Sequence, residues 1–420
     1  MIRAVSRSVH IAGDRPLHFP YYLVALVSAL LACPRSLRAQ TLAQTLIDLP
    51  DASPITEAPP APSPSAPIPL AAPLPAAPPG EAIAAQVGTR AALRAQNPNA
   101  RNQIDDAGLE GEADVVFWGQ VHPLLKWQAG FMGAFVPQGA TASAALLDLV
   151  AKLEFAEALN LWVGRMPIPS DRASLSTVWA IAPWTLPGKY SVYAPFAARP
   201  APGPRQGDND RGDGATLWGQ VGGGTFKYYL GVFGLDQPQT SPLYSARLAL
   251  SLLNPEPGFR AISTYFGAKD VLALGLGVQH RAGDSRAPAG YTTPASDFNE
   301  LNADLLLEKG SPTAGILSLE SSFAKLWGDN ELASYQFFAL VSYLMPVEIG
   351  IGRVQPLVRL QHAGRGNASD ASAFTSIDAQ LGYIIDGFHA RLLGVYQYSK
   401  VQGQIENAIL LGVQMLSHSK

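Results

Sequence analysis

Side chains that could do covalent or metal chemistry are few in this sequence, and they are not grouped. The histidines His122, His280, His362 and His389 lie in separate stretches, and no pair has the spacing of metal ligands. No nucleophile elbow is present to carry the mechanism of a serine hydrolase. The sequence therefore predicts no catalytic site, no metal site and no cofactor, so that the chain is not expected to be an enzyme.

Three short motifs invite a functional interpretation and are better explained by structure. The three glycines of 222–224 and the two of 275–277 precede no plausible helix, so they are typical of turns or close packing rather than of a phosphate-binding loop. The Arg-Gly-Asp triplet at 211–213 would suggest cell adhesion, but three common loop residues match often by chance. These motifs predict no ligand.

Charged side chains follow a different pattern, because they alternate with apolar ones along extended stretches. A row of charges on one face of a strand can filter ions electrostatically without transforming them. We expect these side chains to line the interior of the fold. The cations are Lys126, Lys152, Lys227, Arg247, Arg353, Arg359 and Arg391, and the anions are Asp148, Glu154, Asp304, Glu308, Glu320, Asp378 and Glu406, so that the wall is balanced in charge.

The elements that would position these charges are clearest in 375–416. Ile377 and Leu381 share one face of an extended stretch, while Asp378 and Gln380 share the other. An Asp-Gly dipeptide at 386–387, suited to a two-residue type I′ turn, then leads into a second alternating stretch, and a third follows. Each strand spans about ten residues, which is enough for a tilted strand to cross hydrocarbon.

Composition indicates that the apolar face contacts lipid. The 420 residues are 47% hydrophobic and only 15% charged, yet no apolar run is long enough for a membrane-spanning helix. A transmembrane β-barrel has this composition, because lipid covers much of the surface that charges normally occupy. The net charge of −3 argues against nucleic acid as a partner.

The N-terminal part divides into a signal and a leader. Arginines precede the apolar run 23–32, which predicts a signal peptide over 1–39; Cys33 leaves lipidation as an alternative. Residues 40–110 are expected to form a Pro- and Ala-rich periplasmic leader, with a possible short helix in 81–103. The barrel is then predicted over 111–420.

Connection lengths support an all-β, antiparallel barrel of 16 strands, with 14 as the alternative. Short turns alternate with longer loops, which is typical of outer-membrane barrels with short periplasmic turns, and single-chain bacterial barrels have even strand numbers. Residues 254–270 carry turn signals and are interpreted as a turn rather than a strand, which keeps the longest connection, 167–212, on the outer side.

The longest connection is the candidate constriction, because it is too apolar to sit comfortably in water. Its cations exceed its anions slightly, which predicts a mild anion preference that fades as salt rises. The cations expected at the constriction are Arg172, Lys189, Arg199, Arg205 and Arg211.

Several segments resemble the bacterial outer-membrane porins of the phosphate-selective porin type. They are LNLWVGRMPIPS at 159–170, RGDGATLWG at 211–219, KYYLGVF at 227–233, NPEPG at 254–258, YFGAKD at 265–270 and LGLGVQ at 274–279. The resemblance implies a long loop folded inward to narrow a pore, and association into homotrimers. The chain departs from the phosphate-specific pattern because it lacks a dense arginine and lysine ladder.

The sequence thus predicts a bacterial outer-membrane porin that lets small hydrophilic solutes, including anionic ones, diffuse and that contacts outer-membrane lipids. Two alternatives stay open: a barrel enzyme acting on lipid, and a structural or adhesin barrel whose long loops bind partners. Leu381→Arg is expected to destabilise the barrel on the lipid side, and Gln380→Arg on the other face is expected to be tolerated.

Overall fold

The computed structural model describes residues 83–97, 106–135, 143–187, 211–234, 241–283, 297–311, 313–328, 333–367, 371, 373–401 and 403–418. All of them belong to one compact unit, Pro67–Lys420. No helix in this described part is long and apolar enough to cross a membrane. The predicted signal peptide and most of the predicted leader lie outside the described residues.

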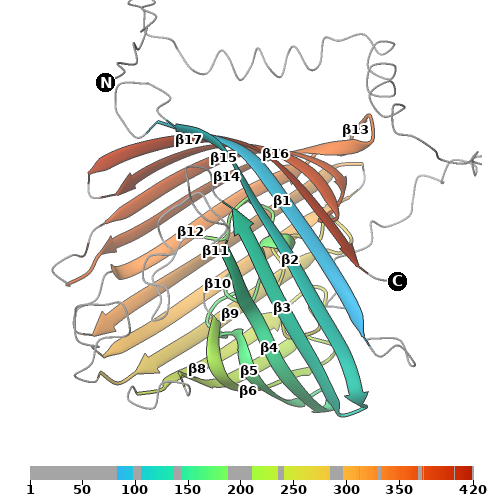
Figure 1. Cartoon of the computed structure of the whole chain (residues 1–420), viewed down its shortest axis with the longest axis vertical. Helices are drawn as coiled ribbons and strands as arrows, with labels where there is room; N and C mark the ends of the chain where they lie inside the picture. Colours follow the sequence, from blue (N-terminus) through green and yellow to red (C-terminus); the bar gives the residue numbers. More distant parts are fainter. Residues whose placement is uncertain are drawn as a thin grey trace, which may run out of the picture. The chain divides into compact units, whose positions relative to one another are not determined.

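The described residues form a closed antiparallel barrel (Figure 1). Its strands are β1 (Ala84–Asn97), β2 (Asp106–His122), β3 (Leu125–Phe135), β4 (Ser143–Ala156), β5 (Leu159–Pro167), β6 (Arg211–Val221), β7 (Phe226–Phe233), β8 (Leu243–Ser251), β9 (Val271–Arg281), β10 (Phe298–Ser311), β11 (Gly315–Gly328), β12 (Ala333–Leu344), β13 (Glu348–Ile349), β14 (Gly352–Arg365), β15 (Phe374–Asp386), β16 (Ala390–Val401) and β17 (Gln404–His418). The two-residue β13 pairs only with β14, so the wall has 16 strands, as predicted.

The barrel closes at its first strand, where the sequence suggested a short helix. On β1, Leu93 pairs with Leu411 of β17 and with Leu109 of β2, and Figure 1 shows β1 (blue) beside β17 (red). The helix prediction was wrong because alanine, the best helix former, dominates β1, whereas pairing on both edges decides its structure. The barrel therefore begins at Ala84 rather than at residue 111.

The outer surface carries the apolar set of each strand. Leu381 of β15, Leu392 of β16 and Leu411 of β17 are 41%, 45% and 55% exposed, while their neighbours on the other face are buried. This distribution confirms the predicted apolar face and gives the barrel a hydrophobic outside, which suits lipid rather than water.

The turn between β15 and β16 differs from the expected two-residue type. Gly387 has φ of 50°, but the turn spans three residues, and Ile384 pairs with Arg391 across a register shift. Phe388 is buried against Phe266 and Ile384, which draws the turn inward. The resulting register differs by two residues from the expected one, so the faces of the strands are unchanged.

Candidate functional site: a barrel lumen crossed by two segments

The first segment inside the barrel is 168–187, which follows β5. Near β8, Ser245 Oγ donates to the carbonyl of Pro169 at 2.6 Å, and Arg247 donates to that of Ser170 at 2.9 Å. On the opposite wall, Arg391 of β16 donates to the carbonyl of Ile181 at 2.7 Å. Because wall strands far apart in the barrel hold its backbone, this segment crosses the lumen.

Side chains of β14, β15 and β1 hold the far end of the segment. Gln380 of β15 donates to the carbonyl of Ala182 at 3.0 Å and accepts from the backbone N–H of Trp184 at 2.8 Å. Arg359 of β14 donates to Thr185, and Arg90 of β1 donates to the carbonyl of Trp184 at 3.0 Å. These contacts satisfy buried carbonyl groups that have no sheet partner.

Two tryptophans of the first inward segment pack against the strands where the barrel closes. Trp184 packs in a buried cluster with residues of β1, β16 and β17, and Trp179 Nε1 donates to Asp114 of β2 at 2.6 Å. The guanidinium carbon of Arg90 lies 4.3 Å from the ring centre of Trp184, a cation–π distance. A Cβ added at Gly412 would lie 2.8 Å from the Trp184 ring, so glycine leaves room for the indole.

Gly412→Ala is therefore expected to destabilise the barrel by about 1–3 kcal/mol through overpacking against Trp184. Gly394→Ala is the matched control, because its added Cβ would meet only ordinary contacts, at 3.7 Å or more. Urea unfolding of the two variants in lipid vesicles, followed by tryptophan emission, measures the difference. Equal stability of the two variants would contradict the seating of Trp184.

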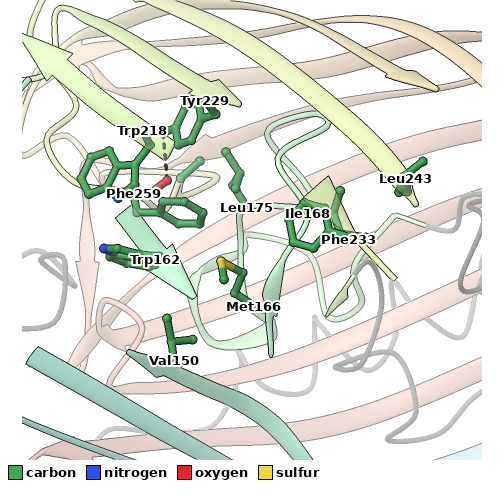
Figure 2. Close-up of a cluster of buried hydrophobic side chains, with 11 residues drawn as sticks. Val150, Trp162, Met166, Ile168, Leu175, Trp218, Tyr229, Phe233, Leu243 and Phe259 are labelled. Atoms are coloured by element: carbon green, nitrogen blue, oxygen red, sulfur yellow. Dashed lines mark hydrogen bonds between the residues drawn. The ribbon is translucent and has the colours of Figure 1, made fainter. Parts of the chain in front are cut away.

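The second segment inside the barrel is 252–270, between β8 and β9. As predicted, it does not form a strand. It also folds inward, which the sequence did not predict. Glu308 of β10 accepts from the backbone N–H groups of Tyr265, at 3.0 Å, and Gly267, at 2.9 Å. Tyr229 Oη of β7 donates to the carbonyl of Phe259 at 2.9 Å, the dashed bond in Figure 2. The wall thus holds this segment from both ends.

The two segments bind each other inside the lumen. Arg172 and Glu256 form an ion pair in which each side chain is only 4% exposed, and Arg172 Nη1 donates to the second carboxylate oxygen at 2.9 Å. Burial alone would raise the pKa of Glu256, but the Arg172 charge outweighs it and lowers that pKa to about 2. Backbone bonds from Ala261 to Leu175 and from Ser263 to Ala180 complete the contact. The lumen is thus narrowed from both ends of the barrel.

The side chains predicted to line the interior lie on inward faces, and several are paired there. Arg359 forms an ion pair with Asp378, Arg247 with Asp304, and Lys126 with Glu154. The others contact the two inward segments, contact the wall or lie at strand ends. They are Lys152, Lys227, Arg353, Arg391, Glu308, Glu320 and Glu406.

The predicted constriction cations are only partly within the described residues. Arg172 lies in the first inward segment, and Arg211 begins β6 and forms an ion pair with Asp148 at 2.9 Å. Lys189, Arg199 and Arg205 lie outside the described residues.

Sequence reasoning missed several interior charges. Glu110, Glu112 and Asp114 are buried at every second position of β2, and Arg90 forms an ion pair with Glu112 at 3.5 Å. Their spacing was the available signal; Glu110 was assigned to the leader, and so was Arg90, the partner of Glu112. Among the described residues, no group of three or more His, Cys, Asp or Glu side chains could hold a metal ion.

No protein-family model and no curated protein sequence matches the chain. Solved structures do match. Salmonella typhi OmpF in complex with daunomycin has a TM-score of 0.50 at 12% identity, covering 79% of this chain and 97% of that one. Vibrio cholerae OmpT with loop L8 deleted has a TM-score of 0.49 at 13% identity, with 80% and 100% coverage. The anion-selective porin from Comamonas acidovorans has a TM-score of 0.49 at 13% identity, with 80% and 99% coverage.

The fold that these observations define is the 16-strand antiparallel barrel of bacterial outer-membrane porins. At this level of identity the likeness shows the fold alone.

Proposed function

We propose that this protein is an outer-membrane channel through which small hydrophilic solutes diffuse. The observation that carries the proposal is the division of the barrel into an apolar outer face and an inner face of charged and amide side chains. In a barrel whose outside faces lipid, a polar interior is suited to hold water and to let hydrophilic solutes pass. No covalent step is part of the proposal.

The channel is expected to be narrow, because both inward segments occupy the lumen. Buried contacts join them to each other and to the wall, so little of the barrel width is left for solutes. Small conductance and a low size limit for solutes follow from this arrangement.

Purified full-length protein in planar bilayers tests the proposal. We expect discrete current steps of small amplitude in potassium chloride. Absence of current from a folded barrel would reject the channel. Release of fatty acid from phospholipid would instead support a barrel enzyme, and binding of a partner without current would support an adhesin.

A mild preference for anions is also proposed. Three ion pairs cancel much of the charge on the inner wall. Of the predicted wall charges outside those pairs, the cations Lys152, Lys227, Arg353 and Arg391 equal in number the anions Asp148, Glu308, Glu320 and Glu406. The wall is therefore balanced, and the proposed preference rests on the slight excess of cations in the predicted constriction loop. Exposed charges more than about 8 Å apart are screened at physiological salt, so the preference should fade as salt rises.

Reversal potentials in a potassium chloride gradient are expected to show weak anion selectivity at low salt. Lys189→Glu combined with Arg205→Glu should reverse the sign, because both cations belong to the predicted constriction loop. Clear cation selectivity of the unmodified protein would contradict this expectation.

We also propose that the protein shares the architecture of the phosphate-selective porin type and forms a homotrimer, but that it is not specific for phosphate. Added phosphate should therefore not block the chloride current more strongly than sulfate does. Mass measurement of the protein in mild detergent tests the trimer.

A further inference from the structure

A cavity of about 800 Å³ lies inside the barrel, between strands β2–β6 and the two inward segments. Lys126 and Trp162 line it from the wall, Val178 from the first segment, and Phe259 and Arg260 from the second. The cavity is large enough for a small organic solute.

One wall of the cavity is aromatic. The Trp162 and Phe259 rings stack with centres 4.3 Å apart, and Trp218 meets Trp162 edge-on at 5.6 Å. Figure 2 shows these three side chains together, with Tyr229 beyond them. Because Phe259 comes from the second segment, this wall exists only when that segment is folded inward. It offers a contact surface for a flat apolar group.

The charges around the cavity leave an excess of positive charge. Asp148 accepts from Arg211 at 2.9 Å and from Arg260 at 2.7 Å, so one carboxylate faces two guanidinium groups. Arg260 Nη1 is buried and has no hydrogen-bond partner among the described residues.

Lys152 is the second cation without a carboxylate of its own. Its ammonium donates to the neutral amide oxygen of Gln128 at 2.8 Å and lies 4.2 Å from the ring centre of Trp162. Lys126 and Glu154 neutralise each other, and Asp114, which also lines the cavity, accepts from Trp179. Five cations therefore face four carboxylates: Lys126, Lys152, Arg211, Arg260 and Lys269 against Asp114, Asp148, Glu154 and Glu157.

We propose that this cavity binds a small organic anion with one carboxylate and a flat apolar body, the carboxylate near Lys152 and Arg260 and the body near the aromatic wall. One negative charge balances the excess, and an ammonium has three donors, of which Gln128 takes one. The inference rests on the proposed channel function, in which the cavity is a binding site on the path of solutes through the barrel.

Equilibrium binding to the full-length protein in detergent tests the site with benzoate as the probe, followed by tryptophan emission and calorimetry. Benzoate is expected to bind, and Lys152→Met to weaken it about tenfold to a hundredfold through loss of a charge-assisted hydrogen bond. Lys400→Met is the matched control, because Lys400 is exposed on β16 and does not line the cavity, and it should bind benzoate as the unmodified protein does.

Benzyl alcohol and acetate separate the two parts of the site. Both should bind more weakly than benzoate to the unmodified protein, and Lys152→Met should leave benzyl alcohol unaffected. Benzyl alcohol binding as tightly as benzoate, or equal benzoate binding by both lysine variants, would overturn the proposal. Near-ultraviolet circular dichroism verifies that Lys152→Met is folded.

Because binding is measured without ion flow, the two hypotheses fail separately. If the protein conducts ions but does not bind benzoate, the proposed binding site is refuted and the channel is not. If it binds benzoate but carries no current, the channel is refuted.

Discussion

Arg172→Met is expected to raise the single-channel conductance several-fold. The substitution leaves the buried Glu256 carboxylate without its cation, and breaking a buried ion pair from one side costs about 3–5 kcal/mol. That cost is comparable to the worth of the bonds that otherwise join the two inward segments, which are two backbone bonds and the bond from Ser176 Oγ to the carbonyl of Ala261, so we expect the segments to separate and the lumen to widen.

The double variant Arg172→Met with Glu256→Gln separates the charge from the contact. It leaves no unpaired charge, so its conductance should lie between those of the unmodified protein and Arg172→Met. Arg165→Met is the matched control, because the ion pair of Arg165 with Asp213 is partly exposed, and such pairs contribute about 0–1 kcal/mol. Unchanged conductance of folded Arg172→Met would show that this pair does not hold the constriction.

The same pair should not act as a pH switch near neutrality. The pKa of Glu256 is lowered from 4.5 to about 2, so its contribution to stability is complete above pH 4.5 and is lost only as the pH falls toward 2. Conductance measured between pH 5 and pH 8 is therefore expected to show no transition from Glu256.

Leu381→Arg is expected to cost the barrel about 2–4 kcal/mol, because the guanidinium would sit in hydrocarbon near the middle of the membrane. Leu381 is 41% exposed on the outer face of β15. Urea unfolding in lipid vesicles measures the loss. Leu381→Ala shortens the same side chain without adding charge and should cost far less; equal losses would mean that this face does not contact lipid.

Gln380→Arg was expected from the sequence to be tolerated, but the structure leads us to expect that it loosens the first inward segment. The Gln380 amide both donates to and accepts from the first inward segment, and arginine has no acceptor. The face was predicted correctly, but the partner on that face is a segment rather than water. Loss of the bond to the Trp184 N–H should loosen the segment and raise conductance.

Strands with strict alternation could be predicted from the sequence, and β14 to β17 are the clearest examples. Their inward charges followed from the same period of two, and Arg359 pairs with Asp378 directly across neighbouring strands. β1 could not be recognised, because small inward residues such as Gly88 and Ala92 remove the contrast between its faces. Their small size leaves room for the rings of Trp179 and Trp184, which the sequence does not place beside them.

The joining of the two inward segments was beyond sequence reasoning for a different reason. Arg172 and Glu256 are 84 residues apart, and neither lies in a strand whose register could align them. Turn signals in 254–270 excluded a strand, but they carry no information on whether a turn points away from the barrel or into it.

The seam between β1 and β17 joins the two ends of the barrel wall. Val87 and Ser417 are 330 positions apart, so the seam is the most distant pairing in the wall and its closure carries the largest loop entropy. Arg90 of β1 and Gln414 of β17, one on each side of the seam, both donate to the first inward segment. The segment therefore bridges the seam from inside, and we expect the contact between the last strand and the first to weaken when the segment is released.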